Sequence, residues 1–337
     1  MSDAVRIPVG KLAAGERPSP AEIGAAFQAI LAGEVEPALM AGFLTALRIR
    51  GETTDDIIAG AKAMRAAVRR VTAPAEAVDT CGTGGLPWAS LNTSTAAAFV
   101  AAGAGAVVAK HGNRSKSRAG SADVLEALGV NLQPTDLQLA ASFRDARVGF
   151  MFAPQHHTAM KHVAPVRAAL GIRTIFNMIG PLANPAGAKR QVLGVFAPEW
   201  VEPLAQALQG LGSETAWVVH GRDGIDEIST TGPTLVAELK AGRITVFELT
   251  PEALGLPRVS MDDLRGGTVE QNAASLRGVL GGEPGPFADL VAANAAAALV
   301  VAGLAPDLKT GIALARESIA SGKAMAAFEA LKVASNG

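Results

Sequence analysis

The chain has 337 residues, enough for about two domains that each bury a core of their own. Its 30 basic and 31 acidic side chains give a formal net charge of -1, which excludes a protein that binds nucleic acid or an anionic membrane by charge alone. A hydrophobic content of 49% with only 18% charged residues excludes a disordered chain, because such a composition buries enough apolar surface to offset the entropy lost on folding.

The sequence carries no signal for membrane insertion or export. Its longest apolar stretch, residues 96–109, is shorter than the ~18 residues that a membrane helix needs and ends at Lys110. Residues 1–6 lack the basic and apolar regions of a secretory signal. Cys81 is the single cysteine, which excludes an intramolecular disulfide and a metal site built from several cysteines. We expect a cytoplasmic protein without a membrane partner.

Three helices are predicted in the first 70 residues. A capping box at residues 19–22, with proline in the first helical position, begins the first of them. The second covers residues 37–50 and ends at Gly51, and the third begins near residue 53 ahead of two acidic side chains. We therefore expect a small helical domain over residues 1–72.

From residue 77 onward, predicted strands and helices alternate. The expected strands are 78–80, 106–109, 148–152, 192–196, 217–220, 235–239 and 244–249. The expected helices are 96–102, 121–128, 135–145 and 200–210, followed by two alanine-rich helices at 287–302 and 306–321 that close the chain. This alternation is typical of the α/β class, so residues 73–337 are predicted to form an α/β domain.

A glycine-rich turn, residues 82–85, follows the first predicted strand. Glycines allow backbone N–H groups to approach an anion, although many such turns are only structural. No Lys-Ser/Thr pair follows at the P-loop spacing, and Pro87 interrupts the GxGxxG pattern, which disfavours ATPases and dinucleotide-binding proteins. Residues 92–95, Asn-Thr-Ser-Thr, begin the next helix and suit either an anion site or an ordinary helix cap.

A second candidate loop, residues 110–118, follows the second predicted strand of this domain. It contains four cations, an amide and two hydroxyl groups, which suit a phosphate ligand or a solvated charged loop. Loops after neighbouring strands meet at the carboxyl edge of an open α/β sheet, where ligands usually bind. The two loops together indicate a polyphosphate ligand.

Asp226 and Glu227 supply adjacent carboxylates after another predicted strand. Hard oxygen ligands suit Mg²⁺ that arrives with a phosphate, although adjacent acids are usually surface residues. Residues 228–233 predict a turn rather than a helix face, which favours the ligand role. The histidines at 156, 157 and 162 lack the HExxH pattern of a zinc site, and no GxSxG motif supports a serine nucleophile.

Taken in order, these motifs resemble the anthranilate phosphoribosyltransferase family over most of the chain. The matching stretches are residues 82–85, 92–95, 110–114, 120–129, 157–167, 174–177, 180–185, 226–227 and 231–233. The resemblance implies transfer of ribose 5-phosphate from phosphoribosyl pyrophosphate (PRPP) to the amine of anthranilate in tryptophan biosynthesis. It implies inversion at the anomeric carbon, release of pyrophosphate and a requirement for Mg²⁺.

The resemblance also implies an architecture. This is the nucleoside phosphorylase type of phosphoribosyltransferase fold, in which a small helical domain, joined by a segment near residues 160–185, faces an α/β domain with a mixed central sheet. A homodimer is usual in the family. An apolar helical face with Leu39, Met40, Phe43 and Leu47 suits either a dimer interface or the core of the helical domain.

Site residues follow from the resemblance position by position. The implied PRPP contacts are Gly82, Gly85, Leu86, Ser90, Asn92, Thr93, Ser94, Thr95, Lys110, His111, Gly112, Asn113, Arg114, Ser115, Lys116, Ser117 and Arg118. The implied anthranilate contacts are Gly82, His111, Asn113, His157, Arg167 and Pro181, and the implied metal ligands are Ser94, Asp226 and Glu227. Lys110, Asn113 and Arg167 are the expected catalytic residues.

Two stretches depart from the family pattern. Leu86-Pro87-Trp88 replaces the usual Asp-Gly after the glycine turn, and the loop after Arg114 is one residue shorter, with cations at 116 and 118. We hypothesise that these cations compensate for altered phosphate contacts, in which case replacing both with alanine raises the Michaelis constant for PRPP.

Two other functions stay open at this point. A pyrimidine nucleoside phosphorylase would use inorganic phosphate and a nucleoside, but Arg167 and residues 110–114 favour the transferase. A non-catalytic nucleic-acid-binding relative would be expected to have a basic surface and to lack the acidic pair. The balanced charge and the presence of Asp226 and Glu227 argue against it.

Overall fold

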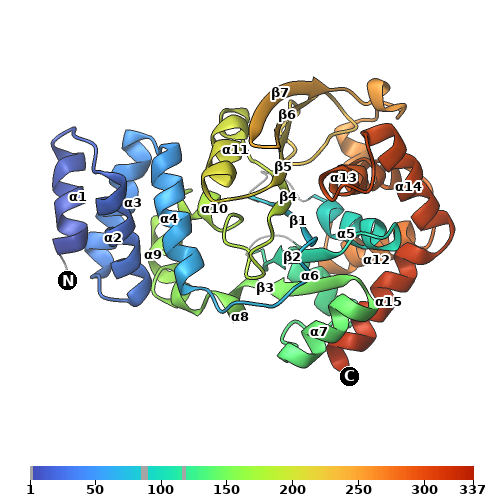
Figure 1. Ribbon diagram of the computed structural model, residues 1–337, viewed down its shortest axis with the longest axis horizontal. Coiled ribbons are helices and arrows are strands. Elements are labelled where there is room, and N and C mark those ends of the chain that lie inside the picture. Colours follow the sequence, from blue (N-terminus) through green and yellow to red (C-terminus); the bar gives the residue numbers. More distant parts are fainter. Residues whose placement is uncertain (1–2, 85–89, 116–118) are drawn as a thin grey trace.

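The computed structural model describes residues 3–84, 90–115 and 119–337. Helices of the N-terminal part stand side by side at one end of the molecule, next to a larger α/β part (Figure 1). These helices are α1 (Asp3–Ala13), α2 (Pro20–Ala32), α3 (Pro37–Arg50) and α4 (Thr54–Ala67). The three predicted helices are confirmed as α2, α3 and α4, and the capping box of α2 pairs Ser19 with Glu22 as expected.

Helix α1 was not predicted. It contains Pro8, which lacks the N–H of a regular helical turn, so the local sequence gives a weak helix signal. Val5, Pro8 and Leu12 are buried on the side of α1 that contacts α2 and α3. Tertiary packing therefore stabilises a helix that local propensity disfavours.

The apolar face of α3 belongs to the core of the helical domain. Met40, Phe43 and Leu47 are almost fully buried within the chain itself, and the Phe43 ring packs edge-on against Phe27 at 5.7 Å. Phe27 also contacts Phe176, at 5.5 Å, which comes from much later in the sequence. The segment that contributes Phe176 includes α8 (Ala153–His156), α9 (Ala164–Leu170) and α10 (Phe176–Ile179).

A seven-stranded mixed sheet forms the centre of the α/β part. Its strands are β1 (Val78–Gly82), β2 (Val108–Gly112), β3 (Val148–Phe152), β4 (Arg190–Gly194), β5 (Thr215–Gly221), β6 (Thr234–Lys240) and β7 (Arg243–Leu249). The strand order is β3-β2-β1-β4-β5-β6-β7, in which the first five strands are parallel and the last two are antiparallel. All seven predicted strands are confirmed, with ends that differ by a few residues.

Helices cover both faces of the sheet. They are α5 (Thr93–Gly103), α6 (Ser121–Ala127), α7 (Asp136–Asp145), α11 (Val201–Gly210), α12 (Val269–Leu280), α13 (Pro286–Val301), α14 (Leu308–Ala320) and α15 (Lys323–Asn336). Helices α5 and α13 lie on one face and α11 on the other (Figure 1). The two predicted alanine-rich helices are confirmed as α13 and α14, whereas α12 and α15, the helix that in fact closes the chain, were not predicted.

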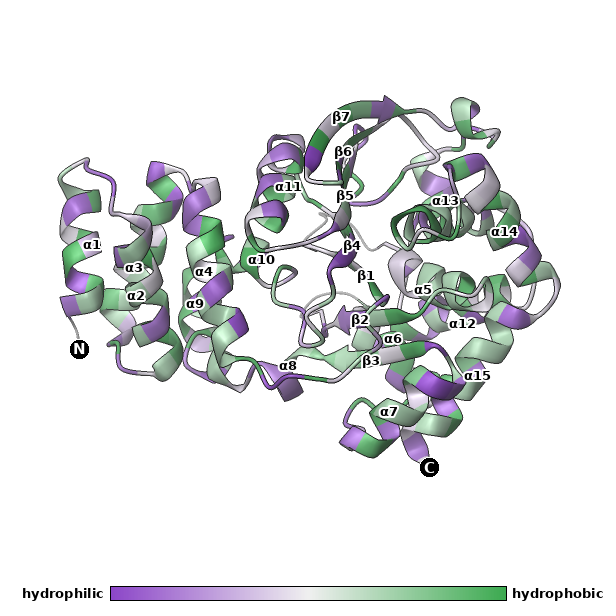
Figure 2. Ribbon diagram, viewed as in Figure 1, coloured by the Kyte–Doolittle hydropathy of each residue, from purple (hydrophilic) through white to green (hydrophobic). Residues whose placement is uncertain are grey.

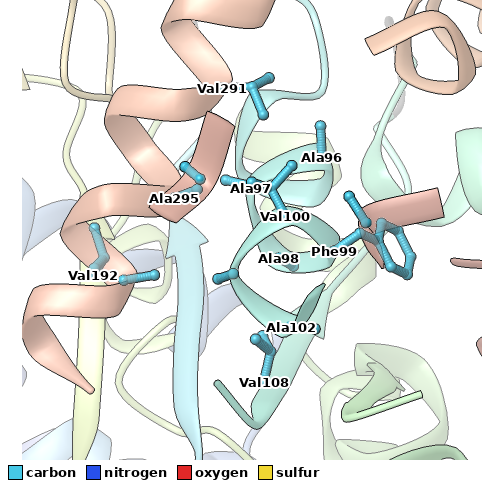
Figure 3. Close-up of a cluster of buried hydrophobic side chains, with 14 of the residues drawn as sticks. Ala96, Ala97, Ala98, Phe99, Val100, Ala102, Val108, Val192, Val291 and Ala295 are labelled. Atoms are coloured by element: carbon cyan, nitrogen blue, oxygen red, sulfur yellow. The ribbon is translucent and has the colours of Figure 1, made fainter. Parts of the chain in front are cut away.

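The alanine-rich helices pack closely against each other and against the strands. Figure 3 shows Val291 and Ala295 of α13 beside Ala97 and Val100 of α5, above Val192 of β4. Both helices are coloured mostly as hydrophobic in Figure 2, in contrast to the alternating colours of α1 to α4. Small side chains on α5 and α13 therefore bring the first turn of α5 close to the carboxyl ends of the strands.

The strand order creates a switch point between β1 and β4. From β1 the chain moves outward to β2 and β3, and it then returns to the opposite side of β1 as β4. Connections on either side of such a point diverge, which leaves a crevice at the carboxyl ends of the two strands. The glycine turn after β1 lies at this crevice, and the loops after β2 and β5 border it.

Candidate active site

The turn after β1 is held by the end of β4. The Thr83 N–H donates to the Gly194 carbonyl at 2.9 Å, and the Thr83 hydroxyl accepts from the Phe196 N–H at 3.0 Å. Gly84 has a φ of 64°, a conformation that favours glycine. The predicted contacts Gly85 and Leu86, with Pro87 and Trp88, lie outside the described residues.

Arg173 is a contact of this turn that the sequence analysis missed. Its Nη1 donates to the Gly84 carbonyl at 3.1 Å, and its guanidinium stacks over the Phe196 ring at 4.2 Å. Burial lowers the pKa of Arg173, while the charge of Asp226 raises it. Residues 174–177 were recognised as a family motif. The position of Arg173 directly before this motif was the signal that could have identified it as a site residue.

The acidic pair closes the other side of the crevice. Asp226 Oδ2 accepts from the Gly84 N–H at 3.2 Å, so the glycine turn and the acidic turn are in direct contact. Burial raises the pKa of Asp226, and burial followed by the Asp226 charge raises the pKa of Glu227 to about 8. Hydrogen bonds from the Thr93 hydroxyl and the Ser94 N–H act in the opposite direction on Glu227.

Asp223 organises the acidic turn from within. Its carboxylate accepts from the hydroxyls of Ser229 and Thr231 and, at 3.0 Å, from the Ile225 N–H. The Gly221 N–H also donates to the Ile225 carbonyl at 2.8 Å. The turn predicted after Glu227 is confirmed, and it presents the two carboxylates toward the start of α5.

The start of α5 is a polar surface rather than a capped helix end. Asn92 makes no side-chain capping bond, and its Nδ2 donates to the Ala119 carbonyl at 3.1 Å. Thr93 and Thr95 are buried, and Ser94 is half-buried. Ser90, the predicted contact before the helix, is half-buried and forms a β-bridge with Arg265. The Thr95 N–H donates to the Asn92 carbonyl at 3.1 Å and the Ser94 N–H bonds to Glu227, while the positive end of the helix dipole favours an anion at this turn.

Lys110 lies beneath the crevice. Its side chain is 2% exposed, and Nζ donates to the Thr80 carbonyl at 2.6 Å and to Ser94 Oγ at 3.3 Å. Burial lowers its pKa, and the charges of Asp79 and Glu227 partly restore it. The predicted catalytic lysine therefore contacts a predicted metal ligand, Ser94, and the Thr80 carbonyl.

The loop after β2 only partly matches its prediction. His111 and Gly112 are half-buried, and Asn113 and Ser115 are exposed. The guanidinium of Arg114 forms ion pairs with Asp123 at 3.0 Å and Glu126 at 2.7 Å, so these carboxylates of α6 occupy it. Arg114 thus links the loop to α6 in this structure, and its contact with PRPP stays a prediction. Lys116, Ser117 and Arg118 lie outside the described residues.

Two histidines, His111 at the end of β2 and His157 after α8, pack against each other. The His111 and His157 rings lie 5.0 Å apart at an angle of 45°, and both Nε2 atoms are buried without a hydrogen-bond partner. Burial and the neighbouring histidines lower the pKa of His111 to about 3, and burial and His156 lower that of His157 to about 4. Both rings are therefore neutral near pH 7. His156 Nδ1 donates to the Arg69 carbonyl at 3.2 Å.

Arg167 is held in place from the same short segment as Arg173. Its Nη2 donates to Asn177 Oδ1 at 3.2 Å, and its guanidinium lies over the Phe176 ring at 5.8 Å. Asn177 also accepts from the Thr174 N–H at 3.1 Å. Arg167 is half-buried, and burial lowers its pKa. Pro181 is half-buried, and its carbonyl accepts from Gln191 at 2.8 Å.

The described part of the chain was also examined for groups of metal-ligating side chains and for helices that could span a membrane. Its His, Cys, Asp and Glu side chains form no group of three or more that could hold a metal ion. Among the same residues, each helix is too short or too polar to cross a membrane.

Comparisons with known proteins agree on one family. Residues 9–68 match the helical bundle domain of the glycosyl transferase family, and residues 74–325 match its a/b domain. An anthranilate phosphoribosyltransferase of Parvibaculum lavamentivorans is 56% identical over 98% of this chain and 97% of its own length.

Solved structures give the same result. The crystal structure of an anthranilate phosphoribosyltransferase from Thermus thermophilus has a TM-score of 0.92 and 47% identity, with coverage of 98% of this chain and 99% of its own. The Saccharomyces cerevisiae enzyme in complex with PRPP and Mg has a TM-score of 0.90 and 28% identity, with coverage of 100% and 99%.

Proposed function

The chain belongs to the anthranilate phosphoribosyltransferase family, and we propose that it transfers the 5-phosphoribosyl group of PRPP to the amine of anthranilate, a step of tryptophan biosynthesis. The products are N-(5-phosphoribosyl)anthranilate and pyrophosphate. The single observation that carries this function is the contact between the glycine turn and the acidic pair, through Gly84 and Asp226, at the switch point of the sheet. This arrangement suits a polyphosphate that arrives with a divalent cation.

Mg²⁺ fits the donor set of the acidic pair. Asp226, Glu227 and Ser94 offer hard oxygen ligands, and burial raises the pKa of both carboxyls. A raised carboxyl pKa means that the negative charge lacks compensation, which a divalent cation supplies. With only two carboxylates here, the ion would take its other ligands from PRPP and water. When bound, it stabilises negative charge on the departing pyrophosphate.

The reaction needs positioning more than base catalysis. The amine nitrogen of anthranilate forms a bond to the anomeric carbon while the bond from that carbon to pyrophosphate breaks, and inversion follows. The electron pair leaves with pyrophosphate, and the amine then loses a proton to solvent. An aromatic amine is already neutral at pH 7, so a strong base is unnecessary. The positive end of the α5 dipole stabilises the charge that develops on the diphosphate.

Lys110 also helps to stabilise the negative charge that develops on the diphosphate. We assign it to positioning Ser94 and to the positive potential under the diphosphate, because its Nζ is bonded to Ser94 Oγ and to the Thr80 carbonyl. This differs from the direct catalytic contact that the family resemblance implied.

The acceptor side suits a flat aromatic acid. His111 and His157 present neutral rings, against which an aromatic ring can pack. The Arg167 guanidinium, oriented by Asn177, can bind the anthranilate carboxylate with two parallel hydrogen bonds. We also assign a catalytic role to Asn113, which is exposed in the loop after β2.

The remaining assignments also stay proposals. PRPP is assigned to Gly82, Gly85, Leu86, Ser90, Asn92, Thr93, Thr95, His111, Gly112, Arg114, Ser115, Lys116, Ser117 and Arg118, and anthranilate also to Gly82 and Pro181. We divide the chain at residues 72 and 73, with residues 160–185 joined to the helical domain. We also expect a homodimer, which sedimentation velocity would detect.

Anthranilate fluorescence provides the test. We expect PRPP to abolish the fluorescence in the presence of Mg²⁺ and not after chelation. The variant Asp226→Asn/Glu227→Gln should lose this activity, while Glu199→Gln/Glu202→Gln, which neutralises two exposed acids at α11, should retain it. Binding of PRPP without loss of anthranilate would contradict the proposed acceptor, and nucleosides with inorganic phosphate would then be assayed.

A further inference from the structure

Two asparagines are buried in the helices behind the candidate site. Asn272 of α12 is 1% exposed, and Asn294 of α13 is 6% exposed. Asn294 lies among alanine, leucine and valine residues in a helix that packs against α5 (Figure 3). A buried amide costs free energy unless its donors and acceptor are all bonded, so the partners of these two side chains carry information.

Asn294 holds the residue that follows the acidic pair. Its Oδ1 accepts from the Ile228 N–H at 3.0 Å, and its Nδ2 donates to the Ile228 carbonyl at 2.9 Å. The second Nδ2 hydrogen is bonded to the Leu290 carbonyl of the same helix, also at 2.9 Å. Both backbone groups of Ile228 are therefore fixed by one side chain, as they would be by a neighbouring strand. Glu227 is covalently attached to this fixed point.

Asn272 holds the start of α5 in a comparable way. Its Oδ1 accepts from the Gly267 N–H at 2.8 Å, while Nδ2 donates to the Ser90 carbonyl at 2.9 Å and to Asn92 Oδ1 at 3.0 Å. Asn92 in turn donates to the Ala119 carbonyl, on the far side of the second loop. The amide of Asn92 is thus oriented at both of its ends.

We propose that Asn272 and Asn294 are positioning residues for the PRPP side of the site, the first acting through Asn92 and the second through the turn that carries Glu227. This inference rests on the proposed function. Neither side chain reaches the substrates, and each sets the orientation of a group that would contact them. A lone asparagine inside an alanine-rich helix is the sequence feature that marks such a residue.

The test compares Asn272→Ala and Asn294→Ala with Ser318→Ala. Ser318 is a matched control, because its buried hydroxyl donates to the Val100 carbonyl of α5 at 2.8 Å but lies away from the acidic turn. PRPP binding is measured by calorimetry over a range of Mg²⁺ concentrations, and both Michaelis constants are measured. Circular dichroism selects folded protein, and Asn272→Ser and Asn294→Ser are used where an alanine variant does not fold.

The two asparagines should give different signatures. We expect Asn294→Ala to weaken PRPP binding about tenfold and to raise the Mg²⁺ concentration at half-saturation. Asn272→Ala should weaken PRPP binding about fivefold without changing the Mg²⁺ dependence, and it should add nothing to the effect of Asn92→Ala. Ser318→Ala should lower the melting temperature without weakening PRPP binding. In all three variants, the Michaelis constant for anthranilate should change less than about twofold.

Two results would overturn the inference. One is PRPP binding that equals the wild type in both asparagine variants while their melting temperatures fall as in Ser318→Ala. The other is an equal rise of both Michaelis constants. A wild-type protein that does not consume anthranilate would instead contradict the proposed function, so the two failures are distinguishable.

Discussion

Gly194 and Asp226 lie so close together that a β-carbon on Gly194 would stand 1.6 Å from the Asp226 carbonyl oxygen. Gly82 is similarly close, because its β-carbon would lie 2.8 Å from Asp226 Oδ2. The absence of side chains at the ends of β1 and β4 therefore allows the acidic turn to cover the switch point. Backbone atoms cannot yield as a flexible side chain can, so this contact constrains the position of the acidic pair.

Gly194→Ala should displace the acidic turn. We expect a loss of roughly 1–3 kcal/mol in the free energy of unfolding, as for overpacking in a core, together with a higher Mg²⁺ requirement. Denaturant unfolding and activity over a Mg²⁺ series measure the two effects. Gly10→Ala in α1, where a β-carbon meets nothing within 4 Å, is the control. It should neither lower the free energy of unfolding nor raise the Mg²⁺ requirement. Normal Mg²⁺ dependence in Gly194→Ala would show that the turn tolerates displacement.

Glu227→Gln should stabilise the metal-free protein while abolishing activity. The folded pKa of about 8 is above the ordinary value of 4.5, so Glu227 lowers stability progressively as the pH rises through that window. At pH 8 without Mg²⁺, the variant should be more stable by on the order of 4 kcal/mol. Thermal unfolding at pH 5 and pH 8, with and without Mg²⁺, measures this. A variant that is less stable than wild type at pH 8 would contradict the raised pKa of Glu227.

His157→Gln should reduce the loss in the free energy of unfolding that occurs as the pH falls below 6.5. The folded pKa of about 4 lies below the ordinary value of 6.5, so wild type loses stability as the pH falls from 6.5 toward 4, because the unfolded chain then binds the extra proton. By pH 5 the loss amounts to roughly 2 kcal/mol. Urea unfolding at pH 7 and pH 5 compares the two proteins. Equal losses in both would mean that another group is responsible.

Arg167→Lys should separate the two substrates kinetically. Lysine keeps the charge but cannot form two parallel hydrogen bonds with a carboxylate, so the Michaelis constant for anthranilate should rise about 10- to 100-fold. The constant for PRPP should stay within about twofold, because Arg167 is bonded to Asn177 and not to the phosphate loops. Steady-state kinetics with each substrate varied in turn tests this. An effect confined to PRPP would reassign Arg167.

The sequence by itself determined the elements whose signals are local. The capping box at Ser19 and Glu22 begins α2 because both partners lie within one helical turn. Strands β1 to β7 were predicted because apolar β-forming residues bounded by turn residues need only short-range information. The glycine turn and the acidic pair were found for the same reason, since each is a short motif.

The hydrogen-bond and ion-pair partners of the site residues became known only from the tertiary structure. The ammonium of Lys110 turns toward Ser94 and Thr80 because the face of β2 on which it lies is covered by α5. Arg114 is paired with Glu126, twelve residues away, a partner that the local sequence pattern does not mark. Asn294 meets Ile228 across 66 positions of sequence. Hydrogen bonds and desolvation act over a few ångströms, so they depend on packing between distant segments, which local patterns do not specify.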